Sequence, residues 1–160
     1  MAVAEIIGAA IGVLLLVVVA YLLVGGTLSA AETVATAQKD LTLLNEARLR
    51  TSITITDKEV QGTTLNISVT NTGDEIITDL PHMDVFSYDT TNGYIHYSYK
   101  STDTGIPETW SVIRFEHDYI HAKELDPGAK LWIKANLPAG ATPISVQVTT
   151  GNGVSAVSGI

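Results

Sequence analysis

The densest group of side chains able to bind a metal lies in the segment FEHDYIHAKE, which carries Glu116, His117, Asp118 and His121. On a helix, His117 and His121 would share one face at the i, i+4 spacing of metal sites. On a strand they would lie about 13 Å apart, too far for one ion. The sequence has neither an HExxH motif nor an EF-hand pattern. We therefore interpret these histidines as exposed on a turn and expect no metal or other cofactor, with a surface calcium site of aspartates and backbone carbonyls as the alternative.

Motifs for catalysis are missing from the sequence. It contains no GxSxG, P-loop or GxGxxG motif. The absence of cysteine excludes thiol catalysis, disulfides and cysteine-based metal sites. The chain has 17 acidic and 9 basic residues and a net charge of −8, which disfavours nucleic acid because phosphate binding needs a basic face. We predict that the protein is not an enzyme, has no catalytic residues and does not bind nucleic acid.

Two features could involve carbohydrate. Asn66-Ile67-Ser68 is the single N-glycosylation sequon, and the alternation of its neighbours places Asn66 toward solvent. Five aromatic side chains could form a carbohydrate-binding platform, although we interpret them as cross-strand packing: Tyr94, Tyr97, Tyr99, Trp110 and Trp132.

A long apolar segment opens the sequence, with no charged residue between Glu5 and Glu32. Residues 6–31 would form about 39 Å of helix, more than the ~30 Å thickness of a hydrocarbon core. A cleaved secretory signal needs a basic start and a shorter apolar stretch, yet no Lys or Arg precedes Lys39. A cleaved signal is therefore disfavoured, and the segment is interpreted as a membrane anchor or as the core of an assembly in which Glu5 pairs with an α-amino group.

The helix is expected to continue beyond this segment. Gly25-Gly26 is a weak point, and Thr27 or Ser29 could cap a restart. A helix of nearly 50 residues, roughly 70 Å long, needs other helices to pack against, and the simplest source of these is further copies of the same chain. After Gly26 the apolar residues at steps of three, four and seven are interpreted as one stripe, formed by Leu28, Ala31, Val34, Ala35, Leu41, Leu44, Ala47 and Leu49. We expect assembly contacts at Glu5, Leu15, Val18, Leu22, Leu28, Leu41 and Leu44.

From Thr51 the hydrophobic period changes from 3.6 to 2 residues. Seven or eight short strands follow, separated by turn sequences such as Gln61-Gly62 and Asn92-Gly93, and EIITDL is one of the expected strands. This pattern predicts an α+β fold with a long hydrophobic helix over residues 1–50 and an antiparallel, Ig-like β-sandwich head over residues 51–160. The predicted core is Ile53, Ile55, Leu65, Ile67, Val69, Val85, Ile95, Ile113, Leu131, Ile133, Val146 and Val148.

The segment MAVAEIIGAAIGVLLLVVVAYLLVGG resembles the mature start of class III signal-peptide members of the type IV pilin superfamily. The segments RLRTSITITD, ISVTNTGDEII, MDVF, LDPGAKLWI and VTTGNGVSA resemble the archaellum group within it, both archaellins and accessory proteins that contact the surface layer. The resemblance implies that a prepilin-type signal peptidase removes a leader. It also implies that Glu5 neutralises the N-terminal amine, here that of Met1, on a neighbouring subunit.

The first functional hypothesis is a structural subunit of an extracellular helical filament, an archaellum or a type IV pilus-like homo-polymer that serves motility or adhesion. Its helices would form the filament core and its heads the outer surface. The subunit would be inserted in the cytoplasmic membrane before an assembly platform there builds the filament. The alternative is a membrane-anchored, stator-type accessory of the archaellum whose β-sandwich binds the surface-layer protein. Other anchored binding domains remain a third class.

Overall fold

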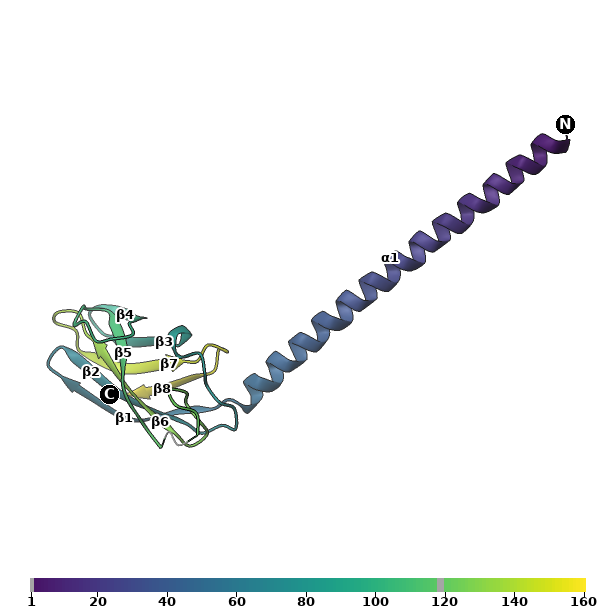
Figure 1. Cartoon of the computed structure of the whole chain (residues 1–160). Coiled ribbons are helices and arrows are strands. Elements are labelled where there is room, and N and C mark those ends of the chain that lie inside the picture. Colours follow the sequence, from purple (N-terminus) through teal and green to yellow (C-terminus); the bar gives the residue numbers. More distant parts are fainter. Residues whose placement is uncertain (1, 118–119) are drawn as a thin grey trace. The chain divides into compact units, whose positions relative to one another are not determined.

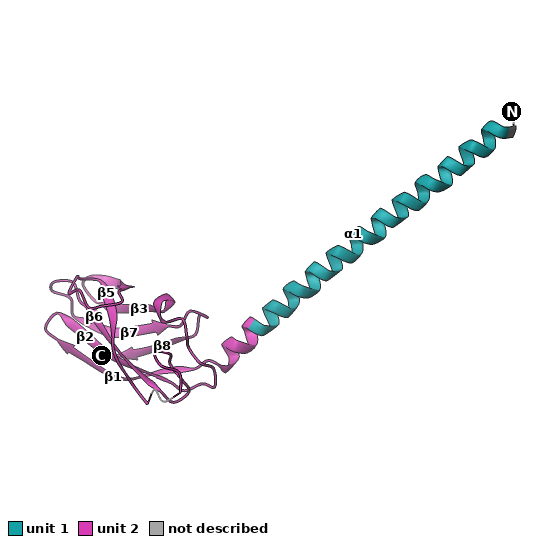
Figure 2. Ribbon diagram, in the orientation of Figure 1, with its two compact units in different colours: residues 1–43 teal, residues 44–160 magenta. Residues whose placement is uncertain are grey.

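The computed structural model describes residues 2–117 and 120–160, so that Met1 and Asp118, both named above, lie outside the described residues. The chain divides into two compact units, residues 1–43 and residues 44–160 (Figure 2). The described residues form one α-helix, α1 (Ala2–Arg50), one 3-10 helix, η1 (Leu80–His82), and eight strands (Figure 1). The strands are β1 (Ile53–Gln61), β2 (Thr64–Asn71), β3 (Asp84–Asp89), β4 (Gly93–Tyr99), β5 (Thr109–Glu116), β6 (Lys130–Asn136), β7 (Pro143–Thr149) and β8 (Ser155–Gly159). The predicted α+β fold is thereby confirmed.

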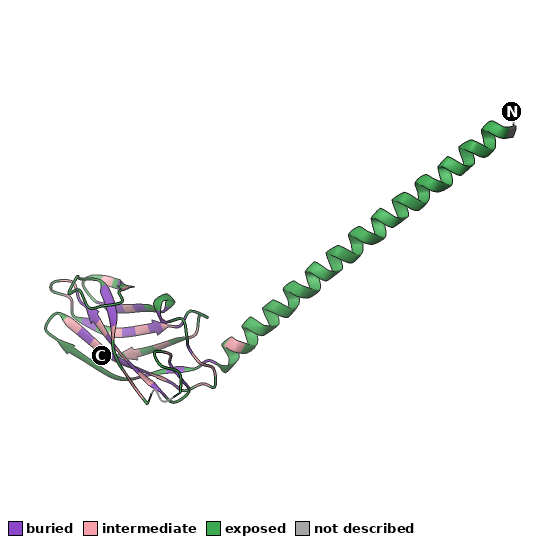
Figure 3. Ribbon diagram, in the orientation of Figure 1, coloured by how far each residue is buried: buried purple, intermediate pink, exposed green. Residues whose placement is uncertain are grey.

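The helix α1 runs through Gly25 and Gly26 without interruption, which confirms the predicted helix of nearly 50 residues, and the possible restart at Thr27 or Ser29 does not occur. Thr27 caps no new helix, because its Oγ1 donates to the carbonyl of Val24, 2.9 Å away within the same helix. Two glycines cost only about 1 kcal/mol each relative to alanine, and the flanking residues are helix formers. Residues 3–46 are all exposed (Figure 3).

In a continuous α-helix, the apolar residues after Gly26 do not form the single stripe predicted from the sequence. Leu28 and Leu44 are 16 positions apart, which at 3.6 residues per turn places them roughly 160° apart around the axis. Leu15, Val18 and Leu22 do share one side, since they are spaced by three and seven residues. The apolar residues of α1 therefore surround the helix, as in a helix that is covered on all sides.

The strands follow one another across the sheet in the order β1-β2-β6-β5-β4-β3-β7-β8. Neighbouring strands are antiparallel except β4 and β5, which form a short parallel pair, so the expectation of a wholly antiparallel sandwich is corrected at this junction. The sheet folds over so that its two end strands, β1 and β8, lie side by side (Figure 1). Lys58 of β1 donates a hydrogen bond from Nζ to Oγ of Ser158 in β8. The core lies between the layers β1-β2-β6-β5 and β4-β3-β7-β8.

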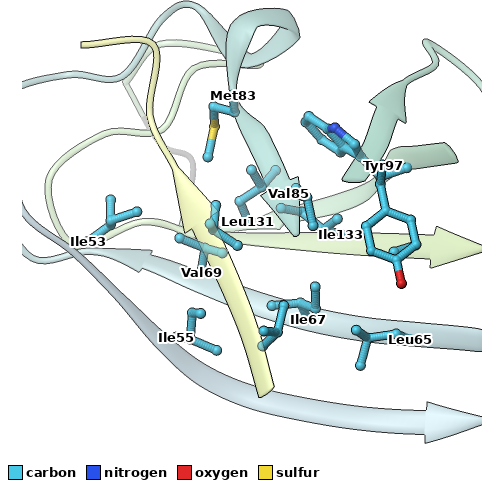
Figure 4. Packing of buried hydrophobic residues seen from close by; sticks show 14 of the residues in the cluster. Ile53, Ile55, Leu65, Ile67, Val69, Met83, Val85, Tyr97, Leu131 and Ile133 are labelled. Atoms are coloured by element: carbon cyan, nitrogen blue, oxygen red, sulfur yellow. The ribbon is translucent and has the colours of Figure 1, made fainter. Parts of the chain in front are cut away.

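Eleven of the twelve predicted core residues are buried, and Figure 4 shows the side chains of Ile55, Leu65, Ile67, Val69, Val85, Leu131 and Ile133 among them. Ile113 is the exception and is 47% exposed. A β-bulge between Val112 and Arg114 makes Ile113 the extra residue of β5, which removes it from the alternating pattern.

The segment EIITDL, predicted as a strand, contributes only an isolated bridge between Ile77 and Leu125. The 3-10 helix η1 follows immediately, with Pro81 inside it, and this ends any extended pairing. The core also contains residues that alternation did not indicate, which are Ile77, Leu80, Met83, Tyr97, Trp110, Leu125, Ala129, Ala135 and Leu137.

Candidate functional site

The predicted assembly residues all lie on α1, and each is exposed. Glu5 stands in the first turn, where a carboxylate interacts favourably with the helix dipole. Leu15 and Val18 expose 57% and 47% of their surface, which is high for large apolar side chains that normally seek burial. Leu28 lies on the opposite side of the helix from Leu44 and does not join one contact surface with it. The role of these residues in assembly stays a prediction.

In the described residues, α1 is the one helix long and apolar enough to cross a membrane, judged by length and composition. Residues 3–46 of this helix are exposed (Figure 3), so its apolar side chains are not covered by the residues that the structure describes. Lipid or neighbouring helices would remove this surface from water, and each buried CH₂ group contributes about 0.8 kcal/mol. The exposed apolar surface of the helix is therefore suited to contact with lipid or with helices of other chains.

The C-terminal end of α1 is fixed within the unit of residues 44–160 by a set of contacts that we call the helix joint, formed by residues 47–52, Asn71–Glu75 and Asn152. The last four carbonyls of a helix lack intrahelical partners. Here the amides of Asp74 and Glu75 donate to the carbonyl of Arg50, at 2.9 and 3.3 Å. The amides of Thr72 and Gly73 donate to the carbonyl of Ser52, at 2.8 and 3.0 Å.

Gly73 permits this approach because it has no side chain. A Cβ atom at this position would lie 2.4 Å from the carbonyl oxygen of Arg50 and 2.4 Å from the amide nitrogen of Ser52. Neither backbone atom can move without disturbing the end of the helix. Glycine is therefore required here by close packing of one backbone on another.

Asn71 holds the turn that carries Gly73. Its side chain is completely buried. Its Nδ2 donates to the carbonyls of Glu75 and Leu125, at 2.7 and 2.9 Å, and its Oδ1 accepts from the amide of Gly73 at 3.0 Å. All polar atoms of this amide are satisfied, which is the condition for burying it at low cost.

A second turn, distant in sequence, completes the helix joint. Asn152, in the T-G-N-G turn after β7, donates from Nδ2 to Oγ1 of Thr51 at 2.7 Å. Thr51 Oγ1 in turn donates to the carbonyl of Ala47 at 2.8 Å. The sequence contained both turns as motifs of the archaellum resemblance, but alternation and turn propensity say nothing about their meeting at the helix end.

The outer face of the β2-β6-β5 layer carries paired charges around Trp132. Arg114 lies over the indole ring, 4.7 Å from its centroid, and Lys130 lies 5.8 Å away. Lys130 forms an ion pair with Asp57 at 3.1 Å. Trp132 therefore packs against cationic side chains, which supports the cross-strand interpretation for this residue rather than an open carbohydrate platform.

Asp103, in the loop before β5, is the most perturbed acid among the described residues. Hydrogen bonds from Lys134 at 2.6 Å, from Asn136 at 3.0 Å and from the amide of Gly105 at 3.0 Å favour its carboxylate. They lower the pKa of Asp103 to about 2, the bond from Lys134 having the largest effect. These contacts fasten the loop to β6.

The other aromatic candidates divide into two groups. Tyr97 and Trp110 are completely buried, and Tyr99 packs on Trp110 with ring centroids 4.8 Å apart. Tyr94 is 79% exposed and packs on Tyr88, with ring centroids 4.9 Å apart. The five side chains thus do not form one platform.

The sequon residue Asn66 is half-buried on β2, between Glu59 of β1 and Lys134 of β6. The sequon hydroxyl of Ser68 is buried and lies 2.8 Å from Oγ1 of Thr56. The predicted solvent face therefore exposes Asn66 only in part. Glycan attachment there stays a prediction.

The histidine segment is arranged around the Asp126-Pro127-Gly128 turn. His121 Nδ1 lies 2.8 Å from Oδ1 of Asp126, and its amide donates to Oδ2 at 3.1 Å. The hydrogen bond with the His121 side chain is the largest influence lowering the pKa of Asp126. His117, at the end of β5, has a left-handed backbone with φ of 62°. Residues 2–117 and 120–160 contain no cluster of three or more His, Asp or Glu suited to a metal ion.

Comparisons with known proteins place the fold. No family model matches the sequence, and no curated protein is detectably similar to it. One similar solved structure is the archaellum periplasmic stator protein FlaG from Sulfolobus acidocaldarius, with a TM-score of 0.51 and 19% identity over 69% of this chain and 99% of that chain. Another is the archaellum periplasmic stator protein complex FlaF and FlaG from the same organism, with a TM-score of 0.51 and 19% identity over 68% of this chain and 87% of that chain.

At this identity the similarity shows the fold alone. The structural neighbours agree with the archaellum part of the sequence resemblance. The type IV pilin part, with its processing step and its role for Glu5, stays a prediction. Over about two thirds of its length, this chain thus has a fold similar to that of archaellum periplasmic stator proteins.

Proposed function

We propose that this chain is a membrane-anchored accessory protein of the archaellum, of the stator type, with its β-sheet head on the outer side of the cytoplasmic membrane. The observation that carries the proposal is a fold similar to that of periplasmic stator proteins, combined with an apolar helix that the described residues leave exposed. Of the two functional hypotheses, this observation favours the accessory over the filament subunit.

The helix joint suits such a role. A stator must resist force between its anchor and the structure that its head holds. Backbone hydrogen bonds at the carbonyls of Arg50 and Ser52, the Asn152–Thr51 bond and the tight packing at Gly73 fix the end of the helix to the head. The proposed binding partners of the head are the surface-layer protein and other archaellum proteins.

The filament subunit is retained as the second candidate because of one observation. Glu5 lies in the first turn of an apolar helix, the position where the resemblance to pilins assigns it to a neighbour's amine. A plain anchor has no need of this carboxylate, whose insertion into a bilayer centre would cost roughly 2.5–3.5 kcal/mol and less near the interface.

Cell fractionation tests the proposal. Cells that produce the full chain are sheared, the released filaments are collected, and the membranes are washed with alkaline carbonate. We expect the chain in the washed membranes and not among the filaments. Recovery of the chain as the main subunit of sheared filaments would contradict the proposal.

The variant Glu5→Gln separates the two candidates further. It removes one charge and keeps the shape of the side chain. A stator-type anchor should remain in the membrane fraction at the wild-type level. A filament that uses the carboxylate to neutralise a buried amine should assemble poorly. If Glu5→Gln cells lost their filaments while wild-type cells kept them, the result would favour the filament subunit.

A further inference from the structure

The strand β4 has one edge that is only partly covered. On one side it pairs with β3 from Gly93 to Tyr97. On the other side only Ser98 and Tyr99 are paired, with Thr109 and Trp110 of β5. This two-residue parallel contact is the seam between the two layers of the head.

The backbone of Tyr94 and His96 faces the uncovered side. The amides of Ser98 and Lys100 donate toward β5, to the carbonyls of Glu108 and Trp110, at 2.9 and 2.8 Å. Amide direction alternates along a strand, so Tyr94 and His96 point to the same side as Ser98. No strand among residues 2–117 and 120–160 pairs with them there. Such a row of unpaired amides and carbonyls is a template for an additional strand.

The chain itself turns away from this edge at Glu108. That residue has a left-handed backbone with φ of 58°, an uncommon conformation for a residue with a side chain. Its amide donates to the carbonyl of Asn136 at 2.8 Å, and its carbonyl accepts from Ser98. With both groups engaged, Glu108 fixes the point at which β5 begins and leaves the edge before it open.

A groove of about 520 Å³ runs along the open edge, lined by Asn92, Tyr94, Ile95, His96, Ser98, Glu108 and Pro138. Its volume is within the range of sites that hold ligands in proteins. The outer face of the edge is aromatic, because Tyr94 packs on Tyr88 and His96 packs on Phe86, with ring centroids 4.9 and 4.8 Å apart. A strand added here would place alternate side chains against these rings.

We propose that the β4 edge binds an extended segment of a basic partner protein by strand addition. Among the described residues that line the groove, Glu108 is the one acidic side chain, and none is Lys or Arg. The chain as a whole carries a net charge of −8. Both charges favour a segment with a lysine or arginine next to Glu108. A second copy of this chain would bring another Glu108 and another −8 charge to the same place, which disfavours it.

The inference deepens the proposed function, because the segment would belong to the partner that the head engages outside the membrane. Binding at β4 and retention in the membrane are measured separately. A failure of peptide binding would leave the anchoring result standing, and a failure of anchoring would leave the β4 edge as a binding site.

Peptide binding to the full chain in detergent micelles tests the proposal. The probes are acetyl-TVKVTV-amide, acetyl-TVEVTV-amide and a lysine peptide N-methylated at its central residues. Isothermal titration calorimetry gives the dissociation constants. We expect the lysine peptide to bind at least about tenfold more tightly than the glutamate peptide, and the N-methylated peptide not to bind.

Two variants at one position separate backbone from side chain. His96→Pro removes the outward amide, and a proline is tolerated where the amide faces solvent. His96→Ala keeps the amide and removes the ring. We expect His96→Pro to weaken binding of the lysine peptide at least about tenfold and His96→Ala to weaken it far less. Glu108→Gln should bring the two peptides close to equal affinity. Circular dichroism verifies that each variant is folded.

Several results would overturn the proposal. They are equal affinity of the lysine and glutamate peptides for the wild-type chain, full binding by the N-methylated peptide, full binding to a folded His96→Pro variant, and no binding of either peptide at millimolar concentration. A concentration-dependent dimer that His96→Pro abolishes would assign the edge to a second copy and would also overturn it.

Discussion

Gly73 occupies a position at which a single methyl group meets the backbone of the helix end. We predict that Gly73→Ala destabilises the unit of residues 44–160 by about 1–3 kcal/mol, the usual cost of overpacking, because its Cβ would lie 2.4 Å from two backbone atoms. Gly159→Ala is the control, since its Cβ would meet only an ordinary contact at 3.8 Å. Thermal unfolding by circular dichroism measures both. Equal midpoints would contradict the close packing at Gly73.

Asn71 offers a second test among the residues. We predict that Asn71→Asp destabilises the fold by on the order of 3 kcal/mol, because the amide donors to Glu75 and Leu125 would be replaced by a buried carboxylate facing two carbonyls. Urea unfolding at pH 7 measures the loss. The exposed neighbour Thr72→Ser is the control. A variant as stable as wild type would show that this amide does not hold the turn.

Asp103 is expected to make the stability of the fold depend on pH. Its pKa of about 2 in the folded chain is below the ordinary 3.8, so its contacts stabilise the fold above pH 4, and this contribution disappears as the pH falls from about 4 to about 2. We predict that Asp103→Asn lowers the urea midpoint at pH 7 and that its difference from wild type shrinks below pH 4. Thr104→Asn changes the same loop without removing a carboxylate. A pH-independent difference would count against the role of the charge.

Among the elements, sequence alternation identified β1 to β7, and buried and more exposed residues alternate most clearly in β3, β4 and β6. It failed where one extra residue or an irregular bridge replaced the alternation. Ile113 left the core through a β-bulge, and EIITDL became a bridge at Ile77 followed by a 3-10 helix. The strand β8 was not predicted, because its alternation is short and its side chains are small or half-exposed.

The two central glycines of the helix α1 allow a test of its continuity. The structure runs through Gly25 and Gly26, and a Cβ at either position would meet no atom within 4 Å. We therefore expect the double variant Gly25→Ala with Gly26→Ala to make the helix more stable, by roughly 1 kcal/mol per position. Thermal melts of helicity in micelles measure this. A loss of helicity, or of membrane retention, would indicate that the two glycines form a required bend.

For the molecule as a whole, the sequence predicted the order of helix and head, but it could not predict the helix joint. Asn71–Glu75 and Asn152 are far apart in the chain, and each looks like an ordinary surface turn. Only the tertiary fold brings them to the carbonyls of Arg50 and Ser52 and to Thr51. The uncovered edge of β4 was equally hidden, because it depends on a parallel pairing with β5 that ends after two residues.

The central claim is that α1 lies in a membrane while the head stands outside it. Because the chain has no cysteine, single cysteines placed by Leu15→Cys and Thr102→Cys can be labelled on intact cells with a membrane-impermeant maleimide, and the cells then sheared. We predict that Thr102→Cys is labelled and stays with carbonate-washed membranes, and that Leu15→Cys is labelled only after the protein is denatured in sodium dodecyl sulfate. Labelled Thr102→Cys protein recovered in sheared filaments, or labelling of Leu15→Cys on intact cells, would contradict the claim.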